Sequence, residues 1–283
     1  MTGTEVDVNY LLPSRIVNLV AVTLISGFNP GPYTGTGNNT YLISGSEPTL
    51  IDAGIGHPKH LAAVRDALAG EGLTRVLVTH GHPDHAAGAS RLAGTWPGLS
   101  FAKMPWPGVD DQFEVPWVAL ADGDQISVGN GYVRVIHTPG HSPDHICFFD
   151  EETRTLFCGD LLIKGASVVI PVSRGGSLTA YLRSLDLIRA LEPTRVLPAH
   201  GPEIDDLTSV VQQYVEHRQY REIEILNVLE DGPVGVDTIV VQVYSSLSGA
   251  LQRMARENVL AHLAKLRDEG RVREDDGLWS SAI

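Results

Sequence analysis

The hexapeptide HGHPDH constrains this chain more than any other feature of its sequence. It places four potential metal ligands, His80, His82, Asp84 and His85, directly after the β-branched run RVLVT. Because side chains alternate along an extended segment, the first two histidines point to the same side and can share one metal ion. Pro83 suits the first turn of a helix, where the neighbouring Asp84 and His85 side chains diverge and can serve a second ion. The fold must therefore end a strand at a metal site.

Three more candidate ligands follow predicted strands and adjoin glycine: His141 in TPGHSPDH, Asp160 in FCGDLL and His200 in LPAHGP. Neutral imidazole and carboxylate are the ligands expected for zinc at ~2.0 to 2.2 Å, and one carboxylate can bridge two ions. Each residue taken alone is explained by an ordinary loop or a helix cap. All seven together predict two open metal sites.

Alternating strand and helix signals predict a layered α/β fold. Apolar, β-branched runs mark the strand candidates at residues 16–24, 41–43, 49–51, 76–78, 133–136, 146–149, 155–157 and 196–197. Apolar residues at helical spacing predict amphipathic helices at residues 60–70, 84–92 and 178–191. Several strands end directly on the candidate ligands, which is typical of a site built on loops over a rigid scaffold.

The pattern changes near residue 204, so we predict a catalytic domain at residues 1–204 and a helical linker with a winged helix at 205–283. A long amphipathic helix at 207–229 is followed by a Gly/Pro break, short helices, a last helix that stops at Gly270 and a short β-hairpin. The presumed recognition helix at 251–269 mixes basic with acidic residues, a poor phosphate-binding face. We therefore expect no sequence-specific DNA binding. The tail should pack against the catalytic domain, where it shapes the groove or forms a homodimer contact.

Composition limits the partners. The net charge of −13 argues against loose capture of nucleic acid or of an anionic membrane, so an RNA substrate would need a local positive patch. No stretch approaches the ~18 apolar residues that span a bilayer, and we expect a cytoplasmic protein. In that compartment Cys147 and Cys158 are expected to be two buried, reduced thiols rather than a disulfide.

The order of the candidate ligands resembles that of the metallo-β-lactamase superfamily, whose members carry HxHxDH followed by a separate His, an Asp and a final His. The resemblance implies a four-layer αββα sandwich. It also implies that Asp160 bridges two ions, the first held by His80, His82 and His141 and the second by Asp84, His85 and His200. The superfamily carries an aspartate at the position of Asp52 in TLIDAG, which we interpret as orienting the metal-bearing loop. Stabilising the Gly54 turn is the alternative.

Within the superfamily, the chain is similar to the branch of beta-lactamase-like protein 2. The resemblance rests on NPGPYTGTGNNTYLI, LADGDQISVGN, TPGHSPDHICF, AHGPEI, VQQYVEHRQYREIEIL and the tail AHLAKLRDEGRV. It implies an endoribonuclease that acts on single-stranded RNA. The chain departs from the branch at Gly81, where an aromatic residue often lies between the two histidines.

Two zinc ions that share a water would lower its pKa and supply hydroxide, with iron or manganese as alternative metals. Asp84 is the candidate catalytic residue, because it can orient the hydroxide and pass a proton to the leaving group. Lys164 and Arg174 are the basic candidates for binding an anionic substrate. His145 is interpreted as packing its strand, with an orienting hydrogen bond as the alternative.

The motif identifies the reaction better than the substrate. The alternatives to RNA are small molecules: an acyl thioester, as for glyoxalase II, and then a β-lactam or lactone. A mononuclear iron enzyme resembling persulfide dioxygenases and a nucleic-acid-binding regulator are the hypotheses outside hydrolysis.

Overall fold

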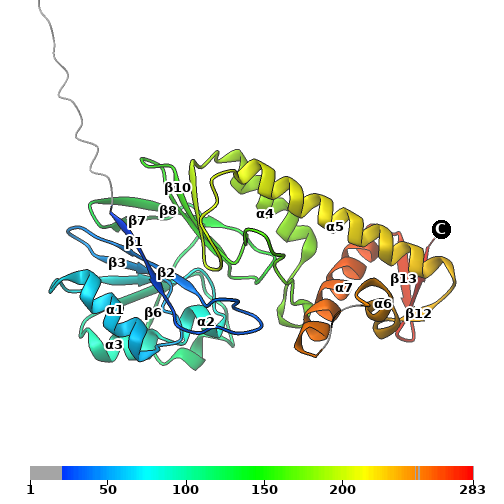
Figure 1. Ribbon diagram of the computed structural model, residues 1–283, viewed down its shortest axis with the longest axis horizontal. Coiled ribbons are helices and arrows are strands. Elements are labelled where there is room, and N and C mark those ends of the chain that lie inside the picture. Colours follow the sequence, from blue (N-terminus) through cyan, green and yellow to red (C-terminus); the bar gives the residue numbers. More distant parts are fainter. Residues whose placement is uncertain (1–20, 246, 248, 283) are drawn as a thin grey trace, which may run out of the picture.

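The computed structural model describes residues 21–245, 247 and 249–282. Two β-sheets and their covering helices form one end of the molecule, and a third, small sheet lies with two helices at the other (Figure 1). The long helix α5 (Leu207–Glu230) begins beside the helix that covers the second sheet and extends to the small third sheet. Among the described residues, no helix is long and apolar enough to cross a membrane.

The first sheet has six strands in sequential order, antiparallel from β1 to β3 and parallel from β3 to β6. They are β1 (Val22–Ser26), β2 (Asn39–Ile43), β3 (Thr49–Ile51), β4 (Arg75–Leu77), β5 (Ser100–Lys103) and β6 (Trp117–Ala119). The strand predicted at 16–24 overlaps β1 only from Val22, and its residues 16–20 lie outside the described residues. Helices α1 (Pro58–Leu68) and α3 (Ala89–Thr95) pack apolar side chains such as Val64 and Leu92 on the outer face.

The second sheet has five strands in the order β11-β10-β9-β8-β7. They are β7 (Gln125–Val128), β8 (Gly131–His137), β9 (Ile146–Asp150), β10 (Thr155–Gly159) and β11 (Arg195–Pro198). Helix α4 (Leu178–Ala190) and the first half of α5 cover its outer face, while Tyr41, Phe148 and Phe157 belong to the core between the sheets. This arrangement confirms the predicted four-layer αββα sandwich.

One predicted helix is wrong in detail. The segment 84–92 forms two helices, α2 (Pro83–Ala86) and α3, with Gly88 between them. The backbone comes very close to its neighbours there: the Gly88 amide donates to the Gly54 carbonyl at 2.8 Å, and a Cβ atom on Gly88 would collide with the Ala53 carbonyl oxygen. This long-range backbone contact interrupts the helix, and helical periodicity alone carries no signal of it.

The C-terminal part forms the predicted winged helix. It consists of β12 (Val234–Gly235), α6 (Val236–Val243), α7 (Ala250–Asp268), β13 (Val272–Asp275) and β14 (Leu278–Ser281), with the sheet order β12-β14-β13. Its core includes the end of α5, while the start of α5 packs into the core of the second sheet. Helix α7 packs against α4 and the 3-10 helix η2 (Val172–Arg174), so the tail contacts the catalytic part as expected. The domain boundary at residues 204 and 205 stays a prediction.

Candidate metal centre

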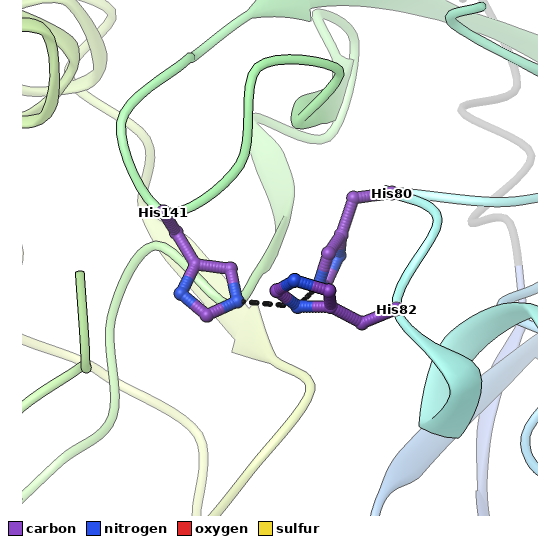
Figure 2. A group of neighbouring side chains, drawn as sticks. All are labelled: His80, His82 and His141. Carbon is purple, nitrogen blue, oxygen red and sulfur yellow. Dashed lines mark hydrogen bonds between the residues drawn. The ribbon is translucent and has the colours of Figure 1, made fainter. Parts of the chain in front are cut away.

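Three histidines from two loops converge in the first candidate ligand group. His80 and His82 follow β4, and His141 lies in the loop between β8 and β9 (Figure 2). Nδ1 of His82 lies 2.9 Å from Nε2 of His80 and 2.8 Å from Nε2 of His141, and all three residues are buried. Nitrogens bound at ~2.0 to 2.1 Å to a tetrahedral zinc ion lie about 3.3 Å apart, close to this spacing. The group can therefore hold one ion after small shifts.

The second group consists of Asp84, His85, Asp160 and His200, whose ligand atoms lie within 4.8 Å of one another. Asp160 extends toward both groups. Its Oδ1 atom lies 3.2 Å from Nε2 of His200 and 3.4 Å from Nε2 of His85, and its Oδ2 atom lies 3.5 Å from Nε2 of His141. The structure thus brings all seven candidate ligands together, with the Asp160 carboxylate where a bridging ligand would lie.

The charges of this cluster fit cations. Burial and the neighbouring imidazoles hold the pKa values of His80 and His82 well below their usual range, which leaves these rings neutral and able to bind metal. Burial alone would lower the pKa of His200, but the Asp160 and Asp84 carboxylates raise it to about 10. The Asp160 carboxylate is buried and lies within 3.5 Å of three imidazole nitrogens, those of His85, His141 and His200. Buried carboxylates and imidazoles gathered in this way are the ligand types that zinc prefers, so the residues present suit a metal.

Asp52 contacts both the metal-bearing loop and a candidate ligand. One carboxylate oxygen accepts the Thr79 amide at 2.8 Å, and the other lies 2.8 Å from Nδ1 of His85. Asp52 has a φ of 64° at the end of β3, which aims its side chain at the loop after β4. A carboxylate on Nδ1 fixes the imidazole with Nε2 toward the metal.

Sequence reasoning missed two buried charged residues. The Lys103 ammonium lies 3.0 Å from Asp144 and 2.6 Å from Asp110, with the lysine side chain fully buried. Asp144 also accepts the Gly81 amide at 2.8 Å and the Ser142 hydroxyl at 2.8 Å. Asp144 therefore ties together the two loops that carry the three histidines. Its place three residues after His141 in TPGHSPDH was the one available signal.

His145 lies behind the site. Burial lowers its pKa to about 3, so the ring is neutral, and its Nε2 atom accepts the Asp160 amide at 3.1 Å. The Thr138 hydroxyl lies 2.8 Å from Nδ1 on the other side of the ring. These contacts match the orienting alternative for His145 rather than strand packing alone.

A cavity of about 420 Å³ opens over both ligand groups. Much of its wall is apolar and includes Tyr33, Ile163, Val168, Val169, Pro171 and Met254. Helix α7 contributes Arg253, Met254 and Glu257, so the winged-helix part lines the same cavity as the candidate ligands.

The two basic candidates from the sequence differ in position. Arg174 lines the cavity, whereas Lys164 does not line it and points its ammonium toward Asp205 at 3.8 Å. Three tryptophans, Trp96, Trp106 and Trp117, lie in the stretch 96–117 and could line a substrate groove. Trp106 lies against His82 at 5.9 Å between ring centroids. Trp96 and Trp117 pack instead against the outer core of the first sheet.

Comparisons with known proteins identify the family of this chain. A family model described as the metallo-beta-lactamase superfamily matches residues 33–200, and one described as the beta-lactamase associated winged helix domain matches residues 236–279. The beta-lactamase-like protein 2 homolog of Caenorhabditis elegans is 34% identical over 260 residues, which cover 89% of this chain and 86% of that protein.

Solved structures of known proteins have a similar fold. The crystal structure of metallo-beta-lactamase family protein TTHA1429 from Thermus thermophilus matches with a TM-score of 0.78 and 25% identity, covering 92% of this chain and 98% of that one. The crystal structure of TTHA1623 in a di-iron-bound form matches with a TM-score of 0.55 and 29% identity, covering 68% and 98%. This chain is therefore a hydrolase of the metallo-β-lactamase superfamily, from the branch of beta-lactamase-like protein 2, with a candidate metal site of histidines and aspartates.

Proposed function

We propose that the chain is a two-metal hydrolase. One ion would be held by His80, His82 and His141, and the other by Asp84, His85 and His200. Asp160 would contribute to both ions. The position of the Asp160 carboxylate between the two groups is the observation that carries this proposal. When bound, two such ions supply a hydroxide nucleophile at neutral pH and polarise the substrate oxygen.

Asp84 is the proposed proton carrier. Its carboxylate lines the cavity, and its Oδ2 atom lies 3.5 Å from both His85 and His200 and accepts from the Asn38 amide at 3.2 Å. Burial would raise its pKa, but the neighbouring histidines hold it well below the usual range, so the group is ionised. An ionised carboxylate held in this way could accept the proton of the attacking hydroxide and then donate that proton to the leaving group.

Zinc is the proposed metal, because neutral imidazoles and carboxylates are its usual ligands. Iron is the alternative, supported by the solved relative described as di-iron-bound. A cytoplasmic location is also proposed. It is supported by Cys147 and Cys158, which are free, buried thiols.

The cavity favours an acyl compound with an apolar body as substrate, and a thioester is the proposed class. A volume of about 420 Å³ with a largely apolar wall suits a small molecule. Arg174 and Arg253 face this cavity from two elements and have no ion-pair partner among the described residues. They can bind an anionic group at the far end of the substrate.

Single-stranded RNA is the second candidate. The same two arginines favour it, because they supply positive charge beside the site and can bind phosphate. Stacking has less support, since only Trp106 of the three tryptophans lies at a candidate ligand. The net charge of −13 also disfavours a long polyanion.

The test is a parallel assay of the metal-loaded protein against S-lactoylglutathione, single-stranded RNA and a chromogenic β-lactam. We expect thioester cleavage that His82→Ala abolishes, because His82 belongs to the first ligand group. Cleavage of RNA without cleavage of the thioester would show that single-stranded RNA, and not a thioester, is the substrate class. Activity that persists in His82→Ala would overturn the two-metal proposal.

A further inference from the structure

The candidate ligand His141 is held by a backbone carbonyl. Its Nδ1 atom lies 2.7 Å from the Val169 carbonyl oxygen, while Nε2 faces His82 and Asp160. Because a carbonyl only accepts, Nδ1 must donate, and this fixes the tautomer that leaves the Nε2 lone pair free for a metal. The position of Val169 therefore sets the orientation and the protonation pattern of His141.

Val169 belongs to an irregular segment between β10 and η2 that has no strand or helix to hold it. Its two neighbours are instead held by side chains from the C-terminal helices. The Val168 carbonyl accepts from the guanidinium of Arg218 on α5, and the Ile170 amide donates to Oδ1 of Asn258 on α7 at 3.1 Å. The backbone on both sides of Val169 is thus fixed from outside the sandwich.

These contacts are buried and mutually connected. Arg218 is 1% exposed and Asn258 is 9% exposed, and a guanidinium nitrogen of Arg218 lies 3.4 Å from Oδ1 of Asn258. The side chains of Val168 and Ile170 are buried as well. A buried amide that loses its acceptor is left without a hydrogen bond, which favours a shift of the segment.

We infer that Asn258 and Arg218 are positioning residues for His141, and that the winged-helix part thereby completes the metal centre. The inference rests on the proposed metal site. This inference gives helix α7 a role that requires no nucleic acid, because residues of α7 hold the segment that orients a metal ligand. Glu257, next to Asn258 on α7, also accepts the Ser173 amide at 3.0 Å beside the same cavity.

The test compares Asn258→Leu, which removes the acceptor, with Asn258→Asp, which keeps it beside the Arg218 cation. Arg256→Gln is the matched control, because Arg256 lies on the same helix, is exposed and pairs with Asp237 away from the segment. The full chain of each variant is titrated with cobalt(II) against a chelator. The dissociation constants and the visible spectrum of the bound cobalt are measured.

We expect Asn258→Leu to weaken the binding of one cobalt ion by about 10- to 100-fold, as for other residues that orient a ligand, and to change the cobalt spectrum. In Asn258→Asp and Arg256→Gln, the cobalt affinity and the cobalt spectrum should stay close to those of the wild-type chain. If Asn258→Leu does not fold, Asn258→Ala removes the same acceptor without adding a bulky side chain.

A purely structural role predicts a different result. Asn258→Leu would then lower the unfolding temperature in chelator but keep the wild-type cobalt affinity and spectrum, and that outcome overturns the inference. If the wild-type chain itself binds no cobalt, the proposed function fails instead. The two failures are therefore distinguishable.

Discussion

The indole ring of Trp106 occupies the space beside Gly81, where a Cβ atom would lie 3.1 Å from Cε3 of the ring. The same indole packs against His82. An aromatic side chain from a distant loop thus lies beside the residue that separates the two histidines. Glycine at position 81 and tryptophan at position 106 are therefore complementary.

This complementarity predicts the effect of enlarging Gly81. Gly81→Phe should displace Trp106, distort the His82 loop and lower hydrolytic activity at least about tenfold, as expected for a displaced catalytic group. The double variant Gly81→Phe with Trp106→Ala should recover part of that loss in a steady-state assay. Gly72→Phe is the control, since a Cβ atom there meets nothing within 4 Å. A double variant no better than Gly81→Phe would contradict the assignment.

The second prediction concerns the stability that the buried Lys103 ammonium contributes. Lys103→Met leaves the Asp144 carboxylate buried without its cation, and breaking a buried pair in this way costs about 3 to 5 kcal/mol. Denaturant unfolding should show a loss of this size, while Lys59→Met at an exposed position should show almost none. Equal stability of the two variants would mean that the pair is not formed.

The two arginines of the cavity predict a separation of kinetic constants. Arg253→Met should raise KM for a thioester with an anionic end by about tenfold, the size expected for one charged hydrogen bond, and leave kcat nearly unchanged. KM for a neutral thioester of similar size should not move. Arg256→Met is the control from the same helix. Equal changes in KM for both substrates would exclude recognition of the anionic end by Arg253.

The pKa of His200 predicts how the metal-free protein responds to pH. Burial opposes protonation of His200, but Asp160 and Asp84 raise its pKa to about 10. Since the unfolded value is about 6.5, the proton on His200 contributes stability that is full below that pH and is lost as pH rises toward 10. The unfolding temperature of the wild-type chain in chelator should therefore decrease as pH rises from about 6.5 to about 10. The unfolding temperature of His200→Gln should depend less on pH over the same range. If the unfolding temperature of His200→Gln depends on pH as steeply as that of the wild-type chain, the proton is not on His200.

The candidate ligands and the layered fold could be identified from the sequence because each relies on local sequence signals. A buried strand reads as an apolar run, and His80, Asp160 and His200 lie within a few residues of such runs, next to glycine. The winged helix was predictable from a helix that ends at Gly270 and a hairpin that follows it.

The contacts that hold the ligands were less visible, because they join residues that are far apart in sequence. Lys103 belongs to β5, for which no strand was expected, and its partner Asp144 lies in another sheet's loop. Asn258 contacts Ile170 across 88 positions of sequence. The charge of Lys164 and its closeness to Asp160 in sequence indicate a role in substrate binding, yet its side chain extends toward Asp205 and does not line the cavity.

The metal content of the purified chain tests the central claim most directly. Elemental analysis after loading with zinc should give about two ions per chain, and Asp160→Asn should lower the content, because Asp160 lies between both ligand groups. Two ions in the wild-type chain and fewer in Asp160→Asn would agree with the shared site. A single iron per chain that is unaffected by replacing Asp84 or His200 would contradict it.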